Sequence, residues 1–251
     1  GKLLTVQRPD PFPHHRSLWI ADKVQVAGRP AVDFYHSWKN LRNPSDPADG
    51  FRHFIRHQRF GELKTIGPTA SVEAELQWMI DDDMPVLDEH RLLRVVALGN
   101  GEYFLDLTWK LTASQGDVKF VSDQVHYAWP YVRIHPQFSG EQGGVITSDQ
   151  GQHGQAATND QTANWIDYSN TIDGETEGLA LFIYPDDDPH RWLTREYGTF
   201  GPRRAAKFSG TQFTLHPEET LHGRVGILIH RGDAKSGRIA ARYRQYIEDQ
   251  L

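Results

Sequence analysis

Residues suited to proton transfer and anion binding gather near the start of the chain, in the segment Pro13-His14-His15-Arg16-Ser17-Leu18-Trp19. Histidine titrates near neutrality and can move protons or bind a metal, and arginine binds carboxylates and oxyanions bidentately. An indole face is a good surface for a sugar ring. Because packing alone rarely needs this mixture, the segment predicts the edge of a polar small-molecule site.

Two further groups extend this predicted chemistry. We expect His15 to transfer protons because it adjoins Arg16, with His14 as its substitute, although either histidine could instead cap the loop. Glu89 and Arg91 stand two residues apart in a predicted strand, so they share a face and can present a carboxylate and a guanidinium together. The alternative is a surface ion pair, which contributes little to stability.

Later segments carry similar side chains. Tyr131, Arg133 and His135 alternate, so an extended strand would place them on one face, where they line a sugar cleft or a solvated surface. The predicted catalytic residues are His15, Glu89 and His190. The predicted substrate-binding residues are His14, Arg16, Trp19, His36, Arg91, His126, Tyr131, Arg133, His135, Asp167, Tyr168, Trp192, Arg195 and Tyr197.

The sequence contains no clear signal for a metal site or a nucleotide-binding site. The chain has no cysteine, which excludes disulfides, thiolate catalysis and cysteine-ligated metals. His53 and His57 would need a helix and a third ligand to chelate a metal, and Asp81-Asp82-Asp83 is most simply a turn. No glycine-rich phosphate loop or nucleotide fingerprint is present. We expect no cofactor, and a divalent metal held by histidine and carboxylate stays an alternative.

Charge and hydropathy limit the partners. A net charge of -6 argues against nucleic-acid binding, which needs a basic face, and no apolar run approaches the roughly 20 residues of a membrane helix. The opening residues lack the apolar stretch of a secretory signal, which favours the cytoplasm. We expect a small carbohydrate ligand, no nucleic acid and no membrane. The oligomeric state is not indicated.

Short runs with period-two alternation, broken by Gly, Pro, Asn and Asp, predict an all-β fold in a single domain over residues 1–251. The clearest hairpin joins 91–98 to 103–113 through Asn100-Gly101, a step that favours a tight turn. Another hairpin spans 23–34, before extended residues Tyr35 and His36. A helix is predicted at about 237–250, with Ser236 as its N-cap. Further strands are expected at 73–80, 118–122, 178–184, 212–215 and 224–230, and long loops at 37–61, 140–163 and around 190–197.

Six separated motifs occur in a recognisable order: His14 to Trp19, Val32 to Tyr35, Glu89 to Arg91, Gly143 to Ile146, Trp165 to Ser169, and His190 to Gly198. In this order they resemble the PmoA-like family of bacterial proteins. The resemblance implies a galactose-mutarotase-like β-sandwich, a fold shared by aldose epimerases, polysaccharide lyases and some glycoside hydrolases, and it favours a carbohydrate ligand. The family is named after a methane monooxygenase subunit, but this chain lacks the spanning helices and a copper-binding pattern, so methane oxidation is not expected.

The expected function is therefore a carbohydrate-active enzyme, a glycoside hydrolase or lyase, that uses histidine and glutamate as acid and base and arginine to bind an anionic group. A non-catalytic sugar-binding or sensing protein is the alternative from another class. An aldose-epimerase-like isomerase is a further alternative.

Overall fold

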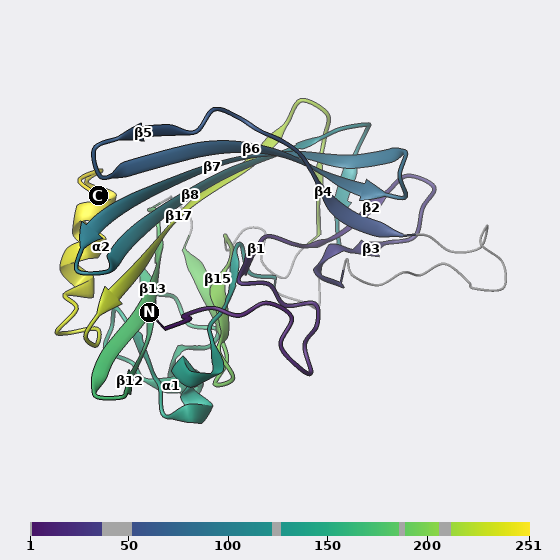
Figure 1. Cartoon of the computed structure of the whole chain (residues 1–251). Helices are drawn as coiled ribbons and strands as arrows, with labels where there is room; N and C mark the ends of the chain where they lie inside the picture. Colours follow the sequence, from purple (N-terminus) through teal and green to yellow (C-terminus); the bar gives the residue numbers. More distant parts are fainter. Residues whose placement is uncertain (1, 37–51, 122–126, 186–188, 206–211) are drawn as a thin grey trace.

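The computed structural model describes residues 2–36, 52–121, 127–185, 189–205 and 212–251. Within them the chain forms an antiparallel β-sandwich with a C-terminal helix (Figure 1). The large sheet has the order β11-β12-β13-β17-β8-β7-β6-β4, with β5 paired to β6. Its strands are β4 (His53–Phe60), β5 (Lys64–Ile66), β6 (Thr69–Ile80), β7 (Met84–Gly99), β8 (Glu102–Ala113), β11 (Val145–Ser148), β12 (Trp165–Ile172), β13 (Glu175–Ile183) and β17 (Thr220–Arg231).

Two smaller sheets complete the sandwich. One has the order β1-β10-β15-β14 and contains β1 (Leu18–Trp19), β10 (Tyr131–Arg133), β15 (Thr199–Ala205) and β14 (His190–Thr194). The other has the order β16-β9-β2-β3 and contains β16 (Phe213–Leu215), β9 (Val118–Phe120), β2 (Lys23–Val26) and β3 (Val32–Asp33). The helical elements are η1 (Phe34–His36), η2 (Pro136–Phe138), η3 (Gly140–Gln142), α1 (Gly154–Thr158) and α2 (Ile239–Ile247).

The main hydrophobic core lies between the large sheet and the smaller ones. Trp78 of β6 and Leu111 of β8 belong to the same buried cluster as Trp19, Val132 and Phe200 of the β1-β10-β15-β14 sheet. A second cluster buries Phe104, Phe182 and Tyr246 where α2 packs at one end of the large sheet (Figure 1). None of the helices in the described part of the chain is long and apolar enough to span a membrane.

The structure confirms the all-β prediction and most of its elements. The hairpin predicted at 91–98 and 103–113 is β7 and β8, and the one at 23–34 is β2 and β3. The strands expected at 73–80, 118–122, 178–184, 212–215 and 224–230 correspond to β6, β9, β13, β16 and β17, and Asp81-Asp82-Asp83 forms the turn between β6 and β7.

Three predicted loops need correction. Residues 37–51 of the first lie outside the described residues, but β4 follows within that loop and pairs with β6. The second contains β11 and α1, and the third contains β14, which pairs with β15. Many side chains of these elements are polar or exposed, so the alternation that marks a half-buried strand is weak or missing.

Two local predictions were also wrong. Tyr35 and His36 lie in η1 and not in an extended strand, because the Asp33 carboxylate accepts the Tyr35 backbone N–H at 3.0 Å and contacts the His36 ring at 2.8 Å. The N-cap of α2 is Arg238, in a left-handed conformation, and not Ser236. Ser236 instead donates its backbone N–H and its hydroxyl to Asp233 in the preceding turn.

The close packing of β15 under the chain segment that enters β10 gives a first prediction. A Cβ atom at Gly201 would lie 2.0 Å from the backbone oxygen of Pro130. Gly201→Ala should therefore force a backbone shift and destabilise the fold by about 1–3 kcal/mol in urea unfolding. Gly61→Ala is the control, since that site is exposed and the new Cβ would lie 3.2 Å from the Glu73 Cβ. Equal stabilities of the two variants would contradict this view of the packing.

Candidate functional site

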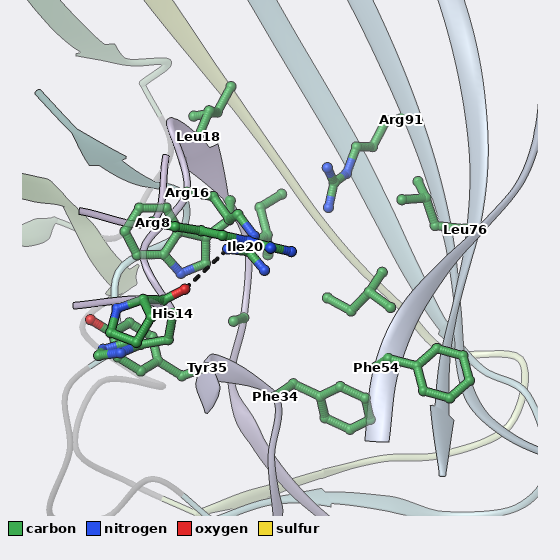
Figure 2. A pocket seen from close by; sticks show the side chains of 14 residues that line it. Arg8, His14, Arg16, Leu18, Ile20, Phe34, Tyr35, Phe54, Leu76 and Arg91 are labelled. Carbon is green, nitrogen blue, oxygen red and sulfur yellow. Dashed lines mark hydrogen bonds between the residues drawn. The ribbon is translucent and has the colours of Figure 1, made fainter. Parts of the chain in front are cut away.

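A cavity of about 630 Å³ lies between the N-terminal segment and the inner face of the large sheet (Figure 2). The segment from Arg8 to Ala21 forms one wall, η1 contributes Phe34 and Tyr35, and strands β4, β6 and β7 form the opposite wall. The lining residues are Arg8, Pro13, His14, Arg16, Leu18, Trp19, Ile20, Ala21, Phe34, Tyr35, Phe54, Ile55, Leu76 and Arg91.

Three guanidinium groups face this cavity. Figure 2 shows Arg8 and Arg16 extending from the N-terminal segment toward Arg91, which reaches in from β7. Arg16 donates to the backbone oxygen of Pro13 at 3.2 Å, and burial together with the nearby charge of Arg8 lowers its pKa. Among the described residues, neither Arg8 nor Arg16 makes an ion pair with a carboxylate.

Glu89 lies behind Arg91 and not in the cavity. Its side chain is fully buried, accepts the Trp78 indole N–H at 2.8 Å and pairs with the Arg91 Nε. Glu89 and Arg91 thus lie on one face of the strand, as predicted. The Glu89 carboxylate is buried, however, and not part of a solvated surface ion pair. Because the carboxylate is held by these two donors and no described lining residue is acidic, the cavity presents net positive charge.

The rest of the lining is aromatic or aliphatic. Trp19, Phe34, Tyr35 and Phe54 contribute rings, and Leu76 of β6 contributes an aliphatic side chain. Phe34, Tyr35, Phe54 and Leu76 are labelled in Figure 2. Phe34 packs against Trp78 with ring centroids 4.9 Å apart, which ties η1 to the large sheet. A ligand here would therefore meet cationic groups at one end and ring faces at the other.

The proton-transfer role predicted for His15 does not fit its surroundings. The residue is 1% exposed, its ring stacks on Phe12 and Trp19, and its Nε2 lies 2.8 Å from the Tyr35 hydroxyl. Burial, aided by the charges of His14 and Arg133, lowers the pKa of His15 to about 3. The ring is therefore neutral at pH 7 and holds Tyr35 in position, while His14 reaches the cavity.

The predicted site residues divide into groups. His14, Arg16, Trp19 and Arg91 line the first cavity, with His15 and Glu89 directly behind it. A second cavity of about 400 Å³ is lined in part by His36, Tyr131, Arg195 and Tyr197. His126 lies outside the described residues.

The other predicted residues serve the fold or lie elsewhere. Arg133 is buried and donates to the Tyr197 carbonyl, and His135 caps η2. His190 lies at a separate cavity beside Tyr243, with its ring 2.7 Å from the Arg203 carbonyl. The remaining three are buried: Asp167 contacts His230 at 2.7 Å, Tyr168 donates to the Arg195 carbonyl at 3.1 Å, and Trp192 donates to the Ala163 carbonyl at 2.8 Å.

Several lining residues were missing from the predicted site. Phe34 and Tyr35 appeared in a sequence motif but were not assigned to the site, and Arg8, Phe54 and Leu76 gave no signal. Leu76 and Phe54 look like ordinary strand residues, and Arg8 lies in a segment without regular pattern. Only the pairing of β4, β6 and β7 and the path of the N-terminal segment bring them together.

A metal centre has no support in the described ranges. No group of three or more histidine, aspartate or glutamate side chains there is arranged to hold an ion. His53 and His57, the pair weighed as chelators, lie in strand β4, and the His53 ring contacts the Asp33 carbonyl at 2.8 Å.

A family model described as a family of unknown function (DUF6807) matches residues 1–244. The chain belongs to the DUF6807 family. No curated protein matches it. The PmoA-like resemblance stays a prediction from the motifs, whereas the β-sandwich that it implied is confirmed.

Solved structures similar to this DUF6807 chain include an alpha-galactosidase from Lactobacillus brevis, with a TM-score of 0.50 and 9% identity over 89% of this chain and 31% of that one. The GH36 alpha-galactosidase AgaA from Geobacillus stearothermophilus has a TM-score of 0.48 and 10% identity over 84% of this chain and 30% of its own. The chain thus spans about a third of the length of these enzymes. At this identity the Lactobacillus likeness shows the fold alone.

The buried neutral His15 gives a prediction about pH. Its folded pKa of about 3 lies below the ordinary 6.5, so the unfolded state binds more protons between these values. The folding stability tied to His15 is complete above pH 6.5 and is lost as the pH falls toward 3. His15→Gln can keep the hydrogen bond to Tyr35. Between pH 7 and pH 4 the wild type should lose about 3 kcal/mol more folding stability than this variant.

Urea unfolding at both pH values measures this difference. His57→Gln on the exposed part of β4 controls for the loss of a histidine as such. If the wild type and His15→Gln lose the same folding stability on acidification, the conclusion that His15 is buried in its neutral form is wrong.

Proposed function

We propose that this chain binds an acidic sugar in the arginine-lined cavity and acts on it as a lyase. The observation that carries the proposal is the set of three guanidinium groups, Arg8, Arg16 and Arg91, around a cavity with no acidic residue in its described lining. Two of these charges have no carboxylate partner among the described residues. A carboxylate on the ligand would supply one through charge-assisted hydrogen bonds.

Other features of the cavity support a sugar as the body of this ligand. The indole of Trp19 and the rings of Phe34, Tyr35 and Phe54 offer apolar faces of the kind on which sugar rings pack. The volume, about 630 Å³, falls in the range that small-molecule pockets take. The fold is also one found in the alpha-galactosidase from Lactobacillus brevis, an enzyme that acts on sugars.

Elimination suits these residues better than hydrolysis. Glycoside hydrolases generally place two carboxyl groups on either side of the scissile bond. Here Glu89, the carboxylate that pairs with the lining residue Arg91, is buried and held by Trp78. An elimination needs instead a cation to stabilise the charge that develops on the ligand carboxylate, a base and a proton donor.

The chain supplies these three parts. The arginines bind the carboxylate, and the His14 imidazole removes the proton from the adjacent carbon. The electron pair of that C–H bond forms a carbon–carbon double bond as the neighbouring carbon–oxygen bond breaks. The Tyr35 hydroxyl, which burial keeps protonated by raising its pKa, donates its proton to the leaving oxygen. The imidazolium then loses a proton to solvent and the phenolate regains one.

Binding tests the first half of the proposal. Uronic acids should raise the melting temperature of the protein, and the parent neutral hexoses should not. Arg16→Ala and Arg8→Ala should each weaken uronate binding about tenfold or more by calorimetry, because each removes a charge-assisted contact. Arg59→Ala is the matched control, since Arg59 pairs with Glu75 at an exposed site on β4. Equal effects of all three variants would contradict an arginine-lined binding site.

Turnover tests the second half. Elimination from an acidic glycoside creates a carboxylate conjugated with a double bond, which absorbs in the ultraviolet. His14→Gln and Tyr35→Phe should each lower kcat about 100-fold or more while uronate binding changes little.

A non-catalytic sugar-binding protein is the second candidate. It is favoured by the buried state of His15 and Glu89, two of the three residues predicted to be catalytic. Uronate binding without any product across acidic glycosides, in the wild type, would support this candidate and overturn the lyase.

A further inference from the structure

The second cavity shares the lining residue Tyr35 with the first one. It has a volume of about 400 Å³. The rings of Tyr127, Tyr131 and Tyr197 form much of its wall, and Arg195 and Arg203 add cationic groups. Aromatic rings beside fixed polar groups characterise small-molecule sites in general.

The walls of this cavity are held in place by their own contacts. The Tyr127 hydroxyl donates to Asp33 at 3.0 Å, and the same carboxylate contacts the His36 ring at 2.8 Å. Arg195 donates to the Asn159 side chain at 2.7 Å. Tyr131 is buried and packs against the Tyr35 ring with centroids 5.0 Å apart. A ligand would therefore meet a surface that needs little reordering, which lowers the entropic cost of binding.

The charges of the second cavity also resemble those of the first. Arg195 makes no ion pair with a carboxylate among the described residues, whereas Arg203 pairs with Asp160 at 3.4 Å. Asp33, the one acidic residue in the described lining, already contacts His36 and Tyr127. The lining thus favours an acidic ligand over a cationic one.

We propose that the second cavity binds a second sugar unit, so that the ligand is an acidic oligosaccharide of at least two units that passes over Tyr35. This inference rests on the proposed function of the first cavity. If one sugar unit occupies each cavity, the glycosidic linkage between the two units lies beside Tyr35, which lines both cavities. The Tyr35 hydroxyl, already fixed by its 2.8 Å contact with His15, then stands next to the bond that an elimination breaks.

Blocking the second cavity alone tests the inference. Leu193 of β14 lines it and is half-buried, and it is absent from the lining of the first cavity. Leu193→Trp should fill part of the space that the second unit needs. Leu193→Phe, a smaller enlargement, serves if the tryptophan prevents folding. Val145→Trp, at an exposed site on β11, is the matched control.

The probes are D-galacturonate, D-glucuronate and the disaccharides of each acid, with affinities measured by calorimetry. The wild type should bind a disaccharide at least about tenfold more tightly than its monosaccharide. Leu193→Trp should reduce the disaccharide affinity to about that of the monosaccharide and leave monosaccharide affinity unchanged. Val145→Trp should behave as the wild type.

The failures of the two proposals have different signatures. If no uronate binds, the proposed function is wrong and this inference fails with it. If monosaccharides bind but disaccharides bind no more tightly, the first cavity stands and the second sugar site is wrong. Equal weakening of mono- and disaccharide by a folded Leu193 variant would also overturn the second site.

Discussion

The buried pairing of Glu89 with Arg91 and Trp78 is the interaction on which the site depends. A carboxylate with no exposed surface is tolerated only when donors hold it, and here one donor is the Arg91 Nε and the other is the indole of the adjacent strand β6. Removal of either donor would leave part of a buried charge uncompensated. The pairing therefore fixes the direction in which the Arg91 guanidinium leaves the sheet, toward the N-terminal segment (Figure 2).

The N-terminal segment makes this fixed guanidinium part of the wall of the first cavity. It brings Arg8 and Arg16 opposite Arg91, and the Phe34 contact with Trp78 holds η1 against the same strands. Like charges gathered in a partly enclosed space repel one another more strongly than they would in water. An anionic ligand of the proposed kind would relieve that repulsion, so an arrangement that costs stability would also favour selective binding.

How far the sequence predicts this arrangement differs between the fold and the site. The period-two pattern of β7 and β8 and the Asn100-Gly101 turn were enough to predict the central hairpin, because half-buried strands and tight turns have local signatures. The clustering of His14, Arg16 and Trp19 singled out residues that line one wall of the first cavity. By contrast, the alternation in 131–135 did not reveal that Arg133 is buried under Tyr197, since burial depends on which sheet covers a strand.

The site residues that sequence reasoning missed or misassigned share one physical cause. Tyr35 reaches the cavity because Asp33 bends the chain into η1, and His15 becomes a neutral positioning residue because Phe12 and Trp19 enclose it. His190, predicted beside these residues, lies at another cavity because β14 runs along the far edge of its sheet. All three outcomes are set by how the chain folds around these residues, which residue types and spacing alone do not encode.

The proposed function requires that the first cavity recognise the negative charge of a sugar ligand. Calorimetric titration of a uronate and of its uncharged carboxamide, at low and high ionic strength, measures this recognition. We expect the uronate to bind more tightly, its affinity to fall as salt screens the arginines, and the carboxamide to bind weakly at either salt concentration. Equal affinities for the two compounds, unchanged by salt, would contradict the proposed function.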